Sequence, residues 1–125
     1  MSAFFELRIY QIFPGKMDEW LYFMEKTIMP FQVEQGMIIH GSFVMDSSDQ
    51  FAVENGERVM KYEKKGNTYV WIRRFENQEE KVKLYKAVYE SKEWVDNIAP
   101  TVANLVDRNS ILVHNLSSTP LSIMK

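Results

Sequence analysis

The sequence contains no cysteine, and this absence removes several kinds of chemistry. Disulfide bonds, thiolate nucleophiles and cysteine-ligated metal sites are all excluded. No run approaches the ~20 apolar residues that a membrane-spanning helix needs. The N-terminal residues also lack the basic start and the apolar core of a signal peptide. We therefore expect a cytoplasmic protein that has no membrane partner.

An excess of positive charge is also missing. Lysine and arginine together number 15 against 17 acidic residues, which gives a net charge of -2. Nucleic acids and anionic membranes bind to basic surfaces, so neither is expected as a partner. Glycine is scarce, and the five glycines stand singly. The sequence thus has no glycine-rich phosphate loop and no dinucleotide fingerprint, and we expect no tightly bound cofactor.

What the chain does contain is an ordered series of strand and helix patterns within 125 residues, a length typical of one domain. Pro30 should kink the first helix or end its regular part. Asn77 suits the N-cap of the second helix, and Asp96 or Asn97 that of the third. The expected elements are strands at residues 5–12, 37–46, 69–75 and 110–117, and helices at 16–35, 77–91 and 98–108. The order β-α-β-β-α-β predicts a ferredoxin-like α+β fold, in which the helices cover one face of a four-stranded sheet.

Residues 47–68 are polar and charged, and they are too many for a plain connection. The pair Asn55-Gly56 is typical of a type I′ turn, which predicts a projecting hairpin over residues 51–62. A mobile surface loop explains the same composition equally well. We expect one domain, residues 1–125, that carries an insert or hairpin at about 47–68.

The strand at residues 69–75 has two unlike faces. Val70 and Ile72 point to one side, as β-branched core residues do. The opposite side suits a cavity or an interface that is apolar but holds something polar or anionic. It carries Tyr69, Trp71, Arg73 and Phe75.

The helices can cover only one face of the sheet, so the other face needs a different partner. The alternation assigns to this free face a set of side chains too apolar and aromatic to leave in water. The set comprises Arg8, Tyr10, His40, Trp71, Arg73, Phe75, Leu112, His114 and Leu116. We expect a second copy of the chain to cover this face with its own sheet, which gives a homodimer.

Arg8 and Arg73 are predicted to be neighbours, because their strands pair at the centre of a ferredoxin-like sheet. A buried guanidinium group needs an anion. Glu6 lies on the same face as Arg8 and could pair with either arginine, which is the structural alternative to a ligand site. Two arginines against one glutamate leave one positive charge over, and this favours a small anionic or carbonyl-bearing ligand.

His40 and His114 are the only histidines, and both are assigned to the free face. Histidine is the usual general base near neutral pH, and we favour His40 as a proton-transfer group. The two histidines fall on opposite edge strands and lack a third ligand at a recognisable spacing, so we expect no metal site. An ordinary interface role is the alternative and is favoured for at least one of them.

The other candidates are side chains that would line a ligand cavity or form hydrogen bonds in it. Tyr10 can donate to a substrate oxygen or across a dimer. Ser42 has no His–Asp partner, so a hydrolase triad is not expected. The candidate catalytic residues are Arg73, Arg8, His40 and Tyr10. The candidate ligand-binding residues are Trp71, Tyr69, Phe75, Ser42, His114 and Glu6.

A series of short motifs over nearly the whole chain carries a resemblance to a known family. The motifs are Phe5-Glu6-Leu7-Arg8-Ile9-Tyr10, Pro14-Gly15-Lys16, residues 36–43, Tyr69-Val70-Trp71-Ile72-Arg73-Arg74-Phe75, Leu84-Tyr85-Lys86-Ala87-Val88-Tyr89, Glu93-Trp94 and Ser118-Thr119-Pro120-Leu121. In this ordered set the chain resembles the NIPSNAP family, small proteins of the dimeric α+β barrel superfamily. The resemblance implies that barrel fold and dimerisation, in a superfamily that spans monooxygenases, isomerases and decarboxylases. The insert at 47–68 departs from the family pattern.

Two functions compete at this point. The first is an enzyme without a tightly bound cofactor, acting on a small aromatic or polyketide-like carbonyl compound by monooxygenase-, isomerase- or cyclase-like chemistry. In it Arg73 and Arg8 would stabilise an enolate or carboxylate. The second is a non-enzymatic binding or interaction module, whose inner sheet face only forms the dimer and whose function lies on the 47–68 excursion.

Overall fold

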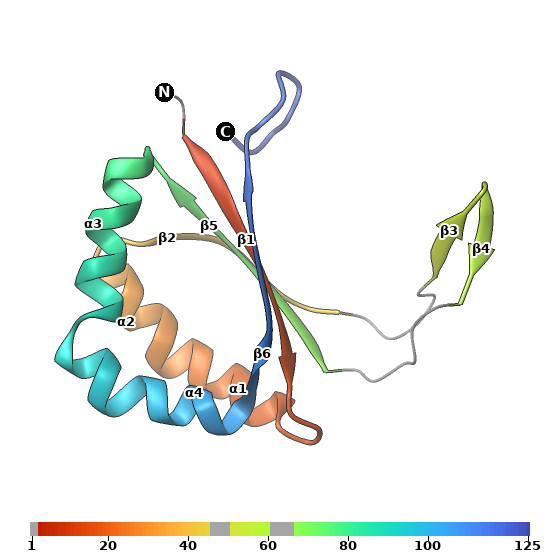
Figure 1. Cartoon of the computed structure of the whole chain (residues 1–125). Helices are drawn as coiled ribbons and strands as arrows, with labels where there is room; N and C mark the ends of the chain where they lie inside the picture. Colours follow the sequence, from red (N-terminus) through yellow and green to blue (C-terminus); the bar gives the residue numbers. More distant parts are fainter. Residues whose placement is uncertain (1–2, 46–50, 61–66) are drawn as a thin grey trace.

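A computed structural model describes residues 3–45, 51–60 and 67–125 of the chain. Its main layer is a four-stranded antiparallel sheet of order β2-β5-β1-β6, and the helices cover one face of it (Figure 1). The strands are β1 (Phe4–Ile12), β2 (Ile38–Val44), β5 (Thr68–Phe75) and β6 (Val106–Leu116). The predicted ferredoxin-like α+β fold is confirmed.

Two helical segments contain a π-helical turn next to a proline. The first consists of α1 (Met17–Phe23), η1 (Met24–Ile28) and α2 (Met29–Glu34), and the second of η2 (Trp94–Ile98) and α4 (Ala99–Leu105). Pro30 and Pro100 follow the two π turns. A proline has no N–H, and its ring collides with the carbonyl group four residues back. The wider turn relieves this conflict: Ala99 donates its N–H to the carbonyl of Trp94, five residues back.

The helix α3 (Gln78–Tyr89) begins as predicted, because the Asn77 side chain accepts a hydrogen bond from the Glu80 N–H at 2.8 Å. The last helical segment begins earlier than the predicted residue 98. Ser91 Oγ accepts from the Trp94 N–H at 3.1 Å, so Ser91 is its cap. The predicted caps Asp96 and Asn97 are wrong, since both lie inside the π turn η2. The following strand also begins earlier than predicted, at Val106.

The assignment of the two sheet faces is reversed relative to the prediction. The β1–β5 register pairs Glu6 with Arg73 and Arg8 with Trp71. These side chains share the face that packs against the helices, where Trp71 is 2% and Arg73 1% exposed. Of the set predicted for the free face, Arg8, Tyr10, Trp71, Arg73 and Phe75 lie under the helices, and His40, Leu112, His114 and Leu116 lie on the free face. Val70 and Ile72 also point to the free face.

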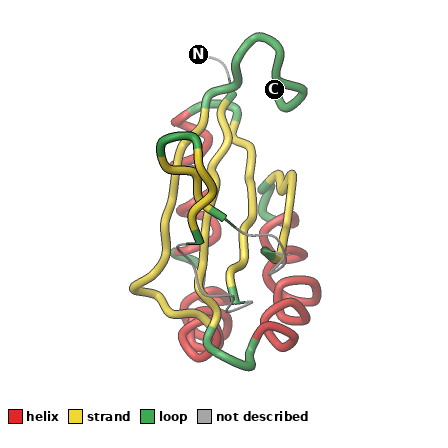
Figure 2. The backbone as a smooth tube through the Cα atoms, turned by 90° about the vertical axis from the view of Figure 1, so that its right-hand side faces the viewer, coloured by secondary structure: helices red, strands yellow, loops and turns green. Residues whose placement is uncertain are grey.

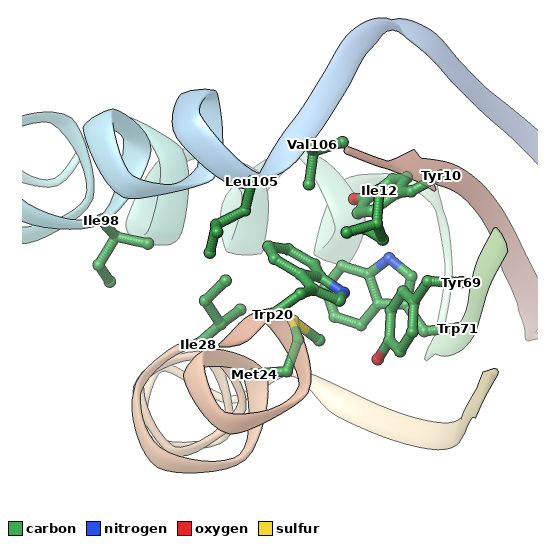
Figure 3. Packing of buried hydrophobic residues seen from close by; sticks show 10 residues of the cluster. All are labelled: Tyr10, Ile12, Trp20, Met24, Ile28, Tyr69, Trp71, Ile98, Leu105 and Val106. Atoms are coloured by element: carbon green, nitrogen blue, oxygen red, sulfur yellow. The ribbon is translucent and has the colours of Figure 1, made fainter. Parts of the chain in front are cut away.

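The physical reason for the reversal is the size of the buried side chains. Aromatic residues bury more apolar surface than valine or isoleucine and therefore gain more under the helices. Figure 3 shows this core, in which Tyr10, Tyr69 and Trp71 from the sheet meet Trp20, Met24 and Ile28 from the first helical segment. A second cluster lies beside α3 and contains Phe4, Met37, Phe75, Leu84 and Val88.

A small hairpin, β3 (Ala52–Glu54) and β4 (Glu57–Val59), forms a separate two-stranded sheet. Asn55 and Gly56 have φ values of 51° and 80°, and a type I′ turn requires positive φ at both positions. The hairpin stands on the side of the main sheet that faces away from the helices (Figures 1 and 2). The predicted hairpin is thus confirmed over residues 51–60, and Tyr62 lies outside the described residues. In the described ranges, no helix has the length and apolar character needed to cross a membrane.

Candidate functional site between the sheet and the helices

Glu6 is the centre of a buried ion cluster. Its Oε1 accepts from Arg8 Nε at 2.8 Å and from Arg73 Nη2 at 2.6 Å. Its Oε2 accepts from Lys81 Nζ at 2.9 Å and from the Tyr85 hydroxyl. The Glu6 side chain is 0% exposed. One carboxylate therefore joins two strand arginines to two side chains of α3.

The cluster carries more positive than negative charge. Among the described residues, two guanidinium groups and one ammonium group contact one carboxylate, so the formal charge of the cluster is +2. Burial raises the pKa of Tyr85 to about 12 and also raises the pKa of Tyr10, so both phenols are neutral near pH 7. Burial by itself would raise the pKa of Glu6, but Arg73 and Arg8 hold that pKa well below its usual range. The surplus of positive charge is therefore present at neutral pH.

Arg73 is enclosed by protein groups. Its Nη1 donates to Gln32 Oε1 and to the Tyr89 hydroxyl, both at 2.8 Å. Its guanidinium carbon lies 4.5 Å from the centroid of the Trp71 ring. These contacts tie α2 and α3 to the sheet, and Arg73 is not among the residues that line the neighbouring cavity. The geometry gives Arg73 a supporting position behind the site.

That cavity has a volume of about 190 Å³ and lies between the sheet and the two helical segments. Arg8, Tyr10 and Trp71 line it from the sheet, and Trp20 and Trp94 line it from the helices. All three tryptophans of the chain therefore contribute to one lining. The cavity combines flat aromatic surface with a guanidinium group.

Arg8 is the arginine of the ion cluster that reaches the cavity. Besides its bond to Glu6, it donates from Nη1 to the Tyr10 hydroxyl at 3.0 Å and from Nη2 to the Tyr85 hydroxyl at 2.9 Å. A guanidinium group has five N–H donors, so the hydrogen bonds to described residues leave one N–H on each terminal nitrogen for another acceptor. The side chain is 14% exposed. Arg8 is thus held in place and still has donors to offer.

The other polar groups of the lining are mainly donors too. The buried indole N–H groups of Trp20 and Trp71 form no well-aligned hydrogen bond with any described residue, although Trp71 interacts with the Tyr10 hydroxyl. Figure 3 shows both indoles within the core, Trp20 from α1 and Trp71 from β5. None of the described residues that line the cavity is an aspartate, glutamate or histidine. Such a lining complements an oxygen that carries negative charge and offers no carboxylate or imidazole base.

A bulge in β6 adds a second arginine to the lining. The β1–β6 register shifts between Ile9 and Gln11. Ser110 fixes the bulge, because its Oγ accepts from the Gln11 N–H at 3.1 Å and donates to the Asp107 carbonyl at 2.6 Å. Arg108 lies in this bulge, is exposed and lines the cavity. It marks the side on which the cavity meets the surface.

Arg108, Trp20 and Trp94 are absent from the site residues predicted by the sequence. The helical pattern of residues 98–108 extends through Arg108 and hides the bulge. The available signal was the polar run 107–110 between two apolar residues, which suits a strand that leaves its register. Trp20 has core spacing on a helix, and nothing in the sequence separates a cavity wall from a packed core residue.

The structure brings together only some of the predicted site residues. Arg8, Tyr10 and Trp71 line the cavity, and Glu6 and Arg73 lie behind Arg8. The remaining residues under the helices lie elsewhere. The Tyr69 hydroxyl forms a hydrogen bond with the Ser42 hydroxyl, and Phe75 belongs to the second core cluster.

The two histidines lie on the opposite side of the sheet from Arg8. His40 packs edge-on against Phe5, with ring centroids 5.2 Å apart, and His114 pairs with Leu7 in the β1–β6 register. Both are exposed. The prediction that they share a face with Arg8 is therefore wrong, and proton transfer by His40 stays a prediction. Over the described ranges, no three acidic or histidine side chains gather as metal ligands.

No protein-family model matches the sequence, and no curated protein is significantly similar to it. A NIPSNAP family protein of unknown function from Agrobacterium tumefaciens is similar in structure, with a TM-score of 0.76 and 14% identity over 99% of this chain and 95% of its own. The chain has the NIPSNAP fold. A second NIPSNAP family protein from that species has a TM-score of 0.72 and 19% identity, covering 97% of this chain and 90% of its own.

A less similar structure comes from outside the proteins described as NIPSNAP. A putative monooxygenase from Lactobacillus acidophilus has a TM-score of 0.54 and 16% identity, covering 92% of this chain and 44% of its own. At these identities the likeness concerns the fold. The resemblance to NIPSNAP proteins predicted from the sequence is confirmed at that level.

Proposed function

We propose that this NIPSNAP-like chain binds a small aromatic or carbonyl compound in the cavity between the sheet and the helices. The observation that carries the proposal is the presence of three tryptophans and Arg8 on one lining. Aromatic rings pack well against indoles, and Arg8 offers donors to a carbonyl, enolate or carboxylate oxygen. The volume of about 190 Å³ suits one substituted ring, since an apolar cavity of about 150 Å³ admits benzene.

The chemistry that this lining supports is stabilisation of negative charge on an oxygen atom. The free N–H groups of Arg8 and the hydroxyl of Tyr10 would bind an enolate as charge develops on it. A reaction of the monooxygenase, isomerase or cyclase class without a tightly bound cofactor passes through such a charge. The shared fold of the putative monooxygenase supports this class. In the described part of the chain the cavity lining contributes no carboxylate or imidazole base, so the reaction would depend on the acidity of the substrate itself.

Intrinsic fluorescence tests the proposal, because all three tryptophans line the cavity. We expect single-ring aromatic carbonyl compounds to change the emission of the full chain in a saturable way. Val102 lines the cavity, so Val102→Phe should fill it and abolish the change. Val95 is 54% exposed on the same helical segment and outside the lining, which makes Val95→Phe the matched control.

The result depends on both variants being folded, which circular dichroism and thermal unfolding establish. Equal saturation curves for Val102→Phe and Val95→Phe would place binding elsewhere. If no ring compound alters the tryptophan emission, the proposed function is wrong.

We also propose that the chain forms a homodimer through the free face of the sheet. The observation in favour is a group of large apolar side chains that stay exposed there: Ile38 (47%), Phe43 (53%), Leu112 (54%) and Leu116 (42%). Contiguous apolar surface of this kind is typical of an interaction site. Since the cavity lies on the other side of the sheet, an interface here leaves the cavity available. Binding and dimerisation are therefore compatible in this structure.

A further inference from the structure

The ion cluster behind the cavity bears on which ligand charge the cavity favours. Arg8 belongs both to that cluster and to the cavity lining. Arg73 and Lys81 pair with the same carboxylate as Arg8, which leaves the cluster with a formal charge of +2. Surplus positive charge away from water is unfavourable unless an anion approaches it. Of the three cations, Arg8 is the one that lines the cavity, so an anion bound in the cavity would meet the surplus charge at Arg8.

The hydrogen-bonding pattern narrows the anion to one type of group. Arg8 has one unused N–H on Nη1 and one on Nη2. Two N–H donors on one guanidinium group can serve the two oxygens of one carboxylate. The Tyr10 hydroxyl accepts from Arg8, so its own proton is available to the same group. The described lining residues include no carboxylate, so the N–H groups of a neutral amide would find only tyrosine hydroxyl oxygens as side-chain acceptors.

Arg108 supplies positive charge at the outer end of the same lining. It is exposed, whereas Arg8 is mostly buried. The Ser110 hydrogen bonds hold the bulge on which it stands. An exposed arginine at the rim of a cavity raises the local concentration of anions and speeds their association.

We propose that the cavity selects small aromatic monocarboxylates over neutral aromatic compounds of the same size. This inference rests on the proposed function and adds the charge of the ligand to it. The ring lies between the tryptophans, and the carboxylate accepts from both terminal nitrogens of Arg8 and from Tyr10. Arg108 attracts the anion at the rim.

Benzoate and benzamide form a matched pair of probes, since they share one ring and differ in charge. Tryptophan fluorescence titrations of the full chain at neutral pH should give an affinity for benzoate at least about tenfold above that for benzamide, because a charged acceptor gains more from Arg8. The benzoate affinity should fall as salt is added, while the benzamide affinity should not. Benzylamine, a cation of similar size, should not bind.

Arg108→Gln tests the rim without disturbing the buried cluster. We expect benzoate to bind about threefold more weakly, because an exposed charge contributes modestly, and benzamide to bind as before. Arg58→Gln is the matched control, since Arg58 lies in the hairpin over the Phe51 ring and does not line the cavity.

Arg8→Lys keeps the charge but removes the paired donors, so it should reduce the preference for benzoate over benzamide. Circular dichroism shows that each variant is folded.

Each outcome separates the inference from the proposed function. Equal affinities for benzoate and benzamide would overturn the preference for carboxylates and leave ring binding in place. The role of Arg108 would be overturned by an Arg108→Gln variant that binds benzoate as tightly as Arg58→Gln does. A chain that binds neither compound, nor any other single-ring compound, would lose the proposed function as well.

Discussion

Glu6 holds together side chains that are remote in the sequence. It binds Arg8 on its own strand, Arg73 on β5 and Lys81 on α3. Breaking a buried pair by removal of one partner leaves an uncompensated charge and is strongly destabilising. In this protein the loss of one carboxylate would leave three cations without their anion. The carboxylate is therefore a determinant of stability as well as a support for Arg8.

At the residue scale we predict that stability depends on the ionisation of Glu6. The pKa of Glu6 is lowered in the folded state, so the unfolded state binds a proton more readily and stability rises with pH in this range. The contribution is complete above the ordinary glutamate pKa of about 4.5 and is lost as the pH falls toward the lower, folded value. Chemical denaturation at pH 7 and at several values below 4.5 measures this loss.

Glu6→Gln provides the comparison. It should lower the free energy of unfolding by about 3–5 kcal/mol at pH 7 and should flatten the decline in acid. Glu76→Gln removes an exposed partner of Arg74 and should cost less than about 1 kcal/mol. An acid profile that is the same in the parent and in Glu6→Gln would contradict the assigned pKa.

At the element scale, irregular segments shape the cavity. The π turn η2 begins at Trp94, which lines the cavity, and the bulge of β6 carries Arg108 to its rim. Regular secondary structure would place both side chains differently, since π turns and bulges each re-aim the residues around them. Pro100 follows the π turn, and the hydrogen bonds of Ser110 hold the bulge.

We predict that the β6 bulge depends on the Ser110 hydroxyl. Ser110→Ala removes a donor to the Asp107 carbonyl and an acceptor for the Gln11 N–H. The free energy of unfolding should fall by about 1–2 kcal/mol, and the Gln11 amide should exchange faster with solvent. Denaturation and amide hydrogen exchange measure the two effects.

Ser117→Ala, at an exposed position just beyond the end of β6, is the control and should change neither quantity. Unaltered exchange at Gln11 in Ser110→Ala would show that the bulge holds without the serine.

At the scale of the whole molecule, the two faces of the sheet carry different features. The face under the helices contains the cavity and the ion cluster, and the free face presents apolar side chains. Because β-strand side chains alternate, neighbouring residues of β1 serve different faces. A substitution on one face should therefore leave the other unaffected.

We predict a dimer in solution that depends on the free face. The parent chain should scatter light as a dimer at micromolar concentration, and Leu112→Asp should scatter as a monomer, because a charge is costly in an apolar interface. Val33→Asp is the control, since Val33 is equally exposed at 55% but lies on α2. Its dimer should persist, and Leu112→Asp should still bind ring compounds in the cavity.

A parent chain that is monomeric at this concentration would contradict the homodimer. So would a Leu112→Asp variant that remains a dimer.

Several features could be predicted from the sequence because they depend on a few adjacent residues. The Asn77 cap, the disturbance at Pro30 and the Asn55-Gly56 turn all follow from local backbone chemistry. The pairing of Glu6 with the arginines was anticipated as one of two alternatives, because the β1 alternation places Glu6 beside Arg8. The sequence did not predict that Lys81 takes part, because Lys81 lies on a helix and no local pattern specifies where that helix packs.

By itself, the sequence determined the order of strands and helices, the hairpin turn and the division of each strand into two faces. Only the tertiary structure decided which face turns toward the helices. The face with Trp71 and Arg73 can be buried because Gln32, Tyr85 and Tyr89 from the helices accept hydrogen bonds from the two terminal nitrogens of Arg73. Those partners are distant along the chain, and period-two alternation carries no information about them. The cavity and its surplus charge depend on the same long-range contacts and so became visible only in the folded molecule.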